Sequence, residues 1–564
     1  MSLFYMIHKK YYLILLLFFL SLNILPQQIS TSSLYNSNPP KYEVRAVWLT
    51  TIGGLDWPNS YNSNIQKKQL CEILDKLKAA NINTVLLQTR VRATTIYPSS
   101  LEPFDGCITG HPGKSPSYDP LEYAISECHK RGMELHCWIV TIPVGKWNGY
   151  GCKQLRQAHP ELIKKIGDEG YMNPEKKGTA DYIANLCSEI ANKYDIDGIH
   201  LDYIRYPETW KNIGNKTEAR NNITNIVKAV NYAVKSSKRW IKISCSPIGK
   251  YDDLTRYHSN GWNAFSRVFQ DAQLWLKDGL MDMLFPMMYF RGNNFYPFAI
   301  DWKENSYGRT VVPGLGIYFL SPKEKNWQLE EITREMEVLR SEGMGFAFFR
   351  TSFLIDDIKK IYEYTSKEFC KYKALTHPMV WESVNKPNSP SRLSIDKNNL
   401  YTTISWNGEN DYKYNVYASS HIPVNINDSR NLIATRLQNK SIQIKNNDKI
   451  YFAITALDRY GNESNPLLSY SLNEDISDDS NNTQNLFIID NYGNINLDKL
   501  SKFADLKHLI ITNSMHQVLY STTSYNNQIN VSNLKNGIYI LRTINKKGIS
   551  HKLGYFEKRT KNTN

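Results

Sequence analysis

The sequence predicts an α/β fold, a TIM (β/α)8 barrel over residues 40–368, followed by two smaller all-β segments. Strand-like and helix-like segments alternate from residue 42 to about 365, which is typical of a parallel sheet with helical crossovers. Eight such strand–helix units fit this length, as a TIM barrel requires. No glycine-rich phosphate loop follows the first strand, which argues against the competing doubly wound open sheet.

The expected barrel strands are short and apolar. They lie at residues 44–50, 84–89, 134–141, 198–203, 241–246, 283–289, 310–317 and 345–349. Helical patterns lie between and after them, near residues 65–80, 119–131, 176–193, 216–236, 264–279, 297–306, 327–341 and 353–364. Because the loops after the strands form the working face of such a barrel, we expect the functional residues there.

The C-terminal third changes character after a Pro/Ser-rich joint. Residues 376–472 contain alternating strands, with Trp406 in an early strand and a Tyr-Phe-Ala-Ile-Thr-Ala run late, and resemble a fibronectin type III sandwich. Residues 473–484 form an acidic, Asn/Ser-rich linker. Residues 485–564 predict a small β-domain, in which Leu534-x-x-Gly-Ile-Tyr-x-Leu541 resembles the sorting domains of type IX secretion. The alternative is a β-domain that only packs on the sandwich.

Residues 1–27 have the layout of a secretory signal peptide. Lys9 and Lys10 precede an apolar run over residues 11–22, and a polar segment follows it. The run is short for a spanning helix, so we expect no stable membrane span after signal cleavage. An uncleaved anchor is the alternative. The protein is therefore expected to be secreted or at the cell surface, with the periplasm as a second location.

The charge and the cysteine pattern limit which binding partners we expect. The formal net charge is +14, of which the leader holds only two lysines, and a basic exported protein favours acidic polymers such as cell-wall material. A Lys-rich, Asn-rich proteome bias explains the charge equally well. Without a zinc-ribbon or helix-turn-helix pattern, we expect no nucleic-acid partner. The eight cysteines form no C-x-x-C pair, so neither a metal nor a cofactor is expected. Cys107 and Cys152, in loops at one end, are the candidate disulfide.

The chemical centre is the segment 195–207. Ile199, Leu201 and Tyr203 alternate with His200 and Asp202, the period of two that sends side chains to opposite faces of a strand. Asp202 would lie at the C-terminal end of that strand, where barrel chemistry is found. The alternative for Asp202 and Arg205 is a structural ion pair.

The other strand ends carry aromatic and polar side chains that suit a polar ring with apolar faces, a sugar. Packing between loops is the alternative for any one of the aromatics. The predicted substrate-binding residues are Trp57, Gln88, Arg90, His136, Trp138, His200, Tyr203, Arg205, Tyr251 and Tyr289, with Trp147 and Tyr206 nearby.

Residues 40–365 resemble the bacterial glycosyl-hydrolase-like family ten of TIM-barrel proteins. The matching phrases are EVRAVW from residue 43, QTR from 88, YDPLEYAI from 118, HKRGMELHCW from 129 and DGIHLDYIRYP from 197, in the family's order. The resemblance implies a glycosidase related to the amylase-like barrels, and some members are understood to act on cell-wall glycans stripped of peptides. The family often has an acidic residue shortly after Arg90, whereas this chain reads Arg92-Ala93-Thr94.

Glycoside hydrolysis usually needs two carboxyls, one protonated and one ionised. The resemblance makes Asp202 the ionised one, kept charged by Arg205 and His200. The acid stays open between Asp252, Asp253, Asp105 and Glu208. The predicted function is a secreted glycoside hydrolase that cleaves O-glycosidic bonds of a polysaccharide, with peptidoglycan glycan strands as a candidate substrate. The alternatives are a non-catalytic glycan-binding barrel and a structural surface protein.

Overall fold

The computed structural model describes residues 39–211, 213–420, 422–447 and 449–469. In the C-terminal part it describes residues 487–490, 493–497, 506–513, 518–523, 528–545 and 550–558. The expected signal peptide 1–27 and linker 473–484 lie outside these ranges, and the expected domain 485–564 lies partly outside them. Among the described helices, none combines the length and the apolar character that a bilayer crossing requires.

The barrel sheet is parallel and follows the expected strands, although β9 to β11 are shorter than expected. They are bonded in the order β10-β9-β8-β7-β3-β2-β1-β12-β11. Their bounds are β1 (Arg45–Leu49), β2 (Thr84–Arg90), β3 (Glu134–Val140), β7 (Gly198–Asp202), β8 (Lys242–Cys245), β9 (Met283–Leu284), β10 (Thr310–Val311), β11 (Gly314–Leu315) and β12 (Phe346–Phe348).

Both ends of this strand order belong to one stretch of chain, residues 310–315. β10 pairs with β9, and β11 pairs with β12 on the other side. Between them, the Val312 amide donates to the Leu284 carbonyl at 2.8 Å, and the Pro313 carbonyl accepts from the Ala347 amide at 3.0 Å. The seventh strand is interrupted at Pro313, which has no N–H to donate. The sheet therefore closes on itself as a TIM-barrel-like ring.

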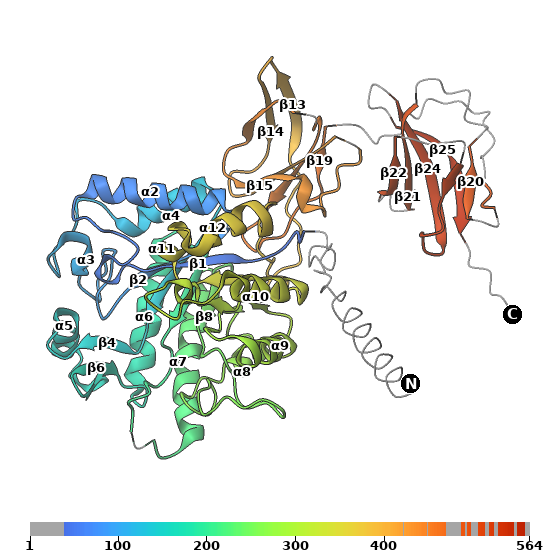
Figure 1. The fold of residues 1–564 in the computed structure, drawn as a ribbon. Helices are drawn as coiled ribbons and strands as arrows, with labels where there is room; N and C mark the ends of the chain where they lie inside the picture. The colour runs from blue at the N-terminus through green and yellow to red at the C-terminus, as the bar shows by residue number, and fades with distance from the viewer. Residues whose placement is uncertain are drawn as a thin grey trace, which may run out of the picture. The chain divides into compact units, whose positions relative to one another are not determined.

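Helices surround the strands (Figure 1). The main ones are α2 (Ser63–Ala79), α4 (Pro120–Lys130), α6 (Lys177–Lys193), α7 (Lys216–Ser237), α8 (Ala272–Lys277), α9 (Tyr296–Glu304), α10 (Leu329–Ser341), α11 (Thr351–Ile355) and α12 (Ile361–Tyr364). Two of the expected helices are longer than the helices that the structure shows. The helix expected at 264–279 is only α8, because Phe269 has a left-handed φ of 63°. The helix expected at 353–364 is broken between α11 and α12, where Asp357, Lys359 and Lys360 have positive φ.

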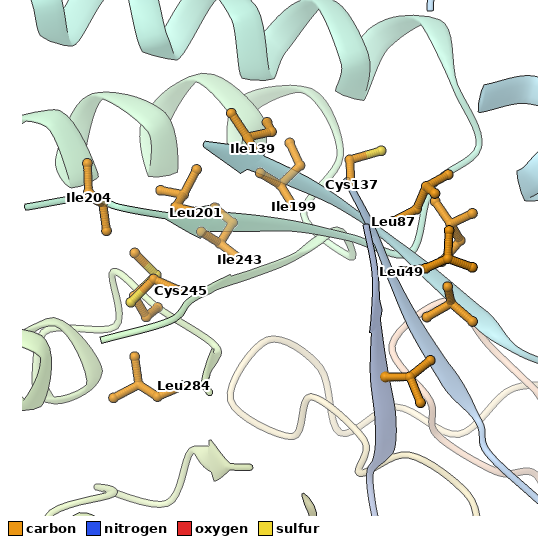
Figure 2. Close-up of a cluster of buried hydrophobic side chains, with 14 of the residues drawn as sticks. Leu49, Leu87, Cys137, Ile139, Ile199, Leu201, Ile204, Ile243, Cys245 and Leu284 are labelled. Atoms are coloured by element: carbon orange, nitrogen blue, oxygen red, sulfur yellow. The ribbon is translucent and has the colours of Figure 1, made fainter. Parts of the chain in front are cut away.

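Two hydrophobic layers follow from the alternation along each strand. Figure 2 shows Ile139, Ile199, Leu201 and Ile243 in the layer between the sheet and the helices. The inner layer fills the ring with Val44, Ala46, Trp48, Leu86, Trp138, Val140, Met283, Phe285, Val312 and Ala347. The ring is thus a packed core, and only residues at its ends can meet solvent.

A small antiparallel sheet is inserted between β3 and α6. It contains β4 (Pro143–Lys146), β5 (Ile163–Ile166) and β6 (Glu169–Met172) beside α5 (Tyr150–Ala158). We did not predict it, because strands of four residues are too short to show a period. Trp147 lies here, with the Arg156 guanidinium 3.8 Å from its ring centroid.

The described strands between residues 391 and 468 form two antiparallel sheets that share one hydrophobic core, and we call them the sandwich. One contains β13 (Ser391–Lys397), β14 (Tyr401–Asn407) and β17 (Ser441–Lys445), and the other β15 (Lys413–Ser419), β16 (Leu432–Leu437), β18 (Tyr451–Leu457) and β19 (Leu467–Leu468). The C-terminal part adds β20 (Asn494–Asn496), β21 (Leu506–Asn513), β22 (Val518–Thr522), β23 (Gln528–Asn530), β24 (Gly537–Asn545) and β25 (Ser550–Lys558). The chain is strand-rich here as expected, whereas the fibronectin type III and sorting-domain assignments stay predictions.

A buried charge network connects the barrel to the sandwich. Arg436 of β16 donates to the barrel carboxylates of Asp197 at 2.6 Å and Glu134 at 3.1 Å. Glu134, only 2% exposed, also accepts from the Lys242 ammonium at 2.7 Å. At Gly132 beside this contact, a Cβ would lie 2.4 Å from the Thr435 carbonyl oxygen of β16. The sandwich therefore packs on the barrel and contributes a charge to it.

Candidate active site

The site is built on β7, whose alternation places His200 and Asp202 inside the ring. Their neighbours Ile199 and Leu201 pack in the outer layer. Asp202 is the last residue of the strand, and Tyr203 after it has a left-handed φ of 52°. This turn ends the strand directly after the carboxylate. Asp202 therefore stands at the C-terminal rim, which we define as the C-terminal ends of the barrel strands.

Three donors hold the Asp202 carboxyl, which is 6% exposed. Trp138 Nε1 donates to Oδ2 at 3.0 Å, and Ser246 Oγ and the Tyr203 amide donate to Oδ1 at 2.7 and 2.8 Å. Burial raises the pKa of Asp202, against the lowering effects of Ser246, Arg205, the Tyr203 amide and Trp138. The net shift is upward. The carboxyl is thus fixed in orientation but keeps its proton to a higher pH than an ordinary aspartate.

His200 does not support the charge of Asp202 as expected. Its Nε2 accepts from Trp48 Nε1 at 3.2 Å, so Nδ1, 3.0 Å from Ser244 Oγ, carries the proton. Burial lowers the pKa of His200 well below its ordinary value, so the ring is neutral. It is fully buried and packs against Phe285 with ring centroids 5.2 Å apart. His200 is therefore part of the barrel interior.

Arg205 provides the charge expected beside Asp202. Its side chain is 4% exposed, and its guanidinium lies 4.5 Å from the Tyr203 ring centroid. It donates to Glu208 Oε1 at 2.6 Å, while its buried Nε has no hydrogen-bond partner among the described residues. Attraction to Arg205 lowers the pKa of Asp202. Tyr203 is 38% exposed, which leaves its ring available at the rim.

Tyr289 completes the group around Asp202. Burial raises its pKa well above the ordinary value, and the negative charge of Asp202 raises it further, so the two groups lie within electrostatic range. Its ring packs on Phe349 at 5.5 Å and on Tyr318 at 5.8 Å. The structure therefore brings together Asp202, Trp138, Tyr203, Arg205 and Tyr289 from the predicted set.

Three predicted binding residues are held elsewhere by their own partners. Trp57 is fully buried and donates from Nε1 to the Gln66 carbonyl at 2.8 Å. Gln88 Oε1 accepts from the Thr51 and Ile52 amides at 3.0 and 2.9 Å, which fixes the loop after β1. Tyr251 donates to Asp271 Oδ1 at 2.7 Å. These contacts fix loops at the rim and do not reach Asp202.

Arg90 and His136 also lie away from the group. A β-bulge between Gln88 and Arg90 pairs Arg90 with the outward-facing Ile139, and Arg90 forms a fully buried ion pair with Glu102 at 2.6 Å. His136, fully buried two residues before Trp138, lies 3.2 Å from Glu134 through its Nε2. It therefore faces the N-terminal half of the ring.

None of the four candidate general acids is hydrogen-bonded to Asp202, whose partners are Trp138, Ser246 and the Tyr203 amide. Asp105 caps α3 (Gly106–Thr109) and accepts from Thr94 Oγ1 at 2.6 Å. Asp253 accepts from the Ser259 hydroxyl and amide, which lower its pKa, so it is a poor proton donor. Asp252 accepts from Ser266 Oγ at 3.1 Å. Glu208 is linked to the group through Arg205. The second carboxyl stays a prediction.

Sequence reasoning missed Ser246 as a partner of Asp202. Ser246 directly follows β8, and β8 pairs with β7, so its position at a neighbouring strand end was the available signal. Cys107 and Cys152 are both free, which does not bear out the candidate disulfide. Within the described ranges, no three His, Cys, Asp or Glu side chains are grouped to hold a metal ion.

Trp138→Phe tests the positioning of Asp202. The change keeps an aromatic ring but removes the Nε1 donor that lowers the pKa of Asp202. We expect kcat for the expected glycan hydrolysis to fall by about 10- to 100-fold. The acid limb of the kcat/KM profile should move to higher pH. Steady-state kinetics between pH 4 and 8 measures both. The control is Trp275→Phe, which removes a buried indole donor to Thr224 in the core. Equal losses in both variants would contradict a specific role for Trp138.

Comparisons with known proteins find similar chains that are named glycosyl hydrolases. Residues 43–319 match the family model Glycosyl hydrolase-like 10. The glycosyl hydrolase YngK of Bacillus subtilis is 26% identical over 75% of this chain and 92% of its own length. The glycosyl hydrolase DigH of Escherichia coli K12 is 28% identical over 44% of this chain and 65% of its own length. These matches support the same family for the barrel.

The solved structures that resemble this chain have lower sequence identity to it than these two relatives. The alpha-L-fucosidase isoenzyme 2 from Paenibacillus thiaminolyticus has a TM-score of 0.41 at 16% identity, over 58% of this chain and 49% of that one. The catalytic domain of beta-amylase from Paenibacillus polymyxa has a TM-score of 0.41 at 11% identity, over 59% and 99%. The barrel assignment rests on the strand order and ring closure described above.

Proposed function

We propose that the protein is a glycoside hydrolase that cleaves O-glycosidic bonds of a polysaccharide at the C-terminal rim of its barrel. The observation that carries the proposal is Asp202, a buried carboxyl with a raised pKa at a strand end, held by Trp138 and Ser246. The family match over residues 43–319 and the two glycosyl hydrolase relatives support it. Tyr203 and Tyr289 supply ring faces on which a sugar can pack.

In this proposal Asp202 is the carboxylate that stabilises or attacks the developing positive charge of the sugar. Its three donors fix the oxygens, and Arg205 favours the charged form. A second carboxyl protonates the leaving oxygen, and Glu208 is the candidate linked to the site through Arg205. Peptidoglycan glycan strands are the proposed substrate, with secretion or a cell-surface location as the context that the leader predicts.

The test is reducing-end release by the purified protein from a panel of polysaccharides, which includes glycan strands stripped of peptides. We expect cleavage of at least one polymer, with peptide-free strands as the first candidate. A folded protein that cleaves none of them would overturn the proposal. One observation favours the alternative, a glycan-binding barrel without turnover: among the residues that the structure describes, no second carboxyl is hydrogen-bonded to Asp202.

The pH dependence follows from the raised pKa of Asp202. An ordinary aspartate loses its charge near pH 3.9, so an activity that needs the carboxylate should here fall at a higher pH. Ser246→Ala removes a donor that lowers this pKa, so its acid limb should lie higher still. The measurement is kcat/KM against pH for both proteins. An acid limb at or below pH 3.9, unmoved in Ser246→Ala, would contradict the assignment.

A further inference from the structure

A cavity lies at the end of the barrel strands opposite the C-terminal rim, against the sandwich. Its volume is about 190 Å³, many times the roughly 10–15 Å³ that a water needs. The barrel side contributes the end of α2, the turn after α4 and the segment before the sandwich, and the sandwich side contributes β16. We call it the junction cavity. None of the rim residues around Asp202 lines it.

The charge of the junction cavity has one sign. Lys78, Lys130, Arg131 and Lys373 line it, and no Asp or Glu is among its lining residues. Two of these cations have carboxylate partners outside the cavity lining: Lys130 pairs with Glu127 at 2.7 Å, and Arg131 pairs with Glu127 at 2.6 Å and with Asp75 at 2.7 Å. The other two, Lys78 and Lys373, have no carboxylate partner among the described residues. The cavity therefore carries an excess of positive charge.

Lys373 shows the effect of this excess. Its ammonium donates to Asn81 Oδ1 at 3.0 Å, a neutral acceptor that does not balance the charge. Burial lowers the pKa of Lys373, and repulsion from Lys78 and Arg45 lowers it further. A half-buried cation with cationic neighbours is stabilised by an anion that joins them. An anion between Lys78 and Lys373 would supply the missing charge.

The remaining lining residues narrow the class of ligand. They are mostly aliphatic or small and include no aromatic ring, so the cavity lacks the surface on which a sugar stacks. A metal cation is excluded by the sign of the charge. We propose that the junction cavity binds a small multivalent oxyanion of the phosphate type, held by Lys78 and Lys373. Because barrel and sandwich both line it, the bound anion stabilises their contact.

The test uses the full chain and isothermal titration calorimetry with inorganic phosphate at constant ionic strength, with chloride as the reference anion. We expect saturable phosphate binding and a rise in Tm with phosphate concentration. Lys78→Gln, at an exposed position where we expect the fold to be kept, and Lys373→Met should each weaken binding at least tenfold. Lys68→Gln, on the same helix but outside the cavity, is the matched control and should bind as the wild type does.

The outcomes of the phosphate titration are independent of the outcome for glycan hydrolysis. Absence of saturable binding, or equal affinity in the wild type and Lys78→Gln, would overturn the proposal, whatever the activity on glycans. Glycerol 3-phosphate in a second titration distinguishes a free anion from an esterified one. Binding of phosphate alone identifies a free oxyanion, and binding of both identifies a phosphate group carried on a larger molecule.

Discussion

Asp202→Asn should lower glycan hydrolysis on the order of 10³-fold, the largest effect that we expect from a single substitution. The amide cannot act as the charged partner of the reacting sugar, whereas its volume is almost unchanged. Folding raises the pKa of Asp202, so its ionised form costs the folded state stability above about pH 4. The uncharged amide removes that cost, and we expect the variant to fold. Reducing-end release, with thermal unfolding in parallel, measures both effects.

The matched control is Asp181→Asn, an exposed aspartate on α6, the helix before β7. It should keep wild-type activity. Wild-type rates in Asp202→Asn would remove Asp202 from the reaction. If the wild type and Asp202→Asn both bind a glycan and neither cleaves it, the barrel is a binding module.

Arg436→Met should lower the free energy of unfolding by about 3 kcal/mol, the largest expected effect on stability. The substitution keeps much of the side-chain length but removes the cation shared by Asp197 and Glu134. Glu134 is 2% exposed and keeps Lys242, whereas Asp197 is left with His129 as its side-chain partner. The expected loss of unfolding free energy is the one seen when one partner of a buried ion pair is removed and the other stays charged. Urea unfolding followed by tryptophan fluorescence measures it.

Arg430→Met is the control within the same sandwich. Arg430 pairs with Asp428 at 2.6 Å, but its side chain is 50% exposed, so its removal should change stability by less than about 1 kcal/mol. Equal, small effects of both substitutions would show that the charge network of Arg436 does not hold the barrel and the sandwich together.

Much of the barrel could be predicted because each strand carries a strong alternating or apolar pattern. The seam at residues 310–315 could not, since two-residue strands on either side of Pro313 have no period of their own. The helix expected at 264–279 failed for a related reason. Its apolar spacing is helical, but Phe269 adopts a left-handed conformation and the Asn263 side chain accepts from the Ser266 and Arg267 amides to form a turn.

The site was predicted in part, because alternation gives the face of a side chain but not its height in the ring. His200 shares the inner face with Asp202, but it lies two residues, about 6.6 Å, below the rim. His136 lies below Trp138 in the same way. Arg90 was misplaced for another reason: the β-bulge before it reverses its face toward Glu102, and no pattern in the sequence marks that bulge.

The close approach of Gly132 to the Thr435 carbonyl, together with the ion pairs of Arg436, limits which domains could replace the sandwich on this barrel. A barrel joined to a foreign partner would leave Glu134 and Asp197 without Arg436. A partner whose backbone approached position 132 as closely as β16 does would require glycine there. A chimera built from this barrel should therefore keep the sandwich attached to it.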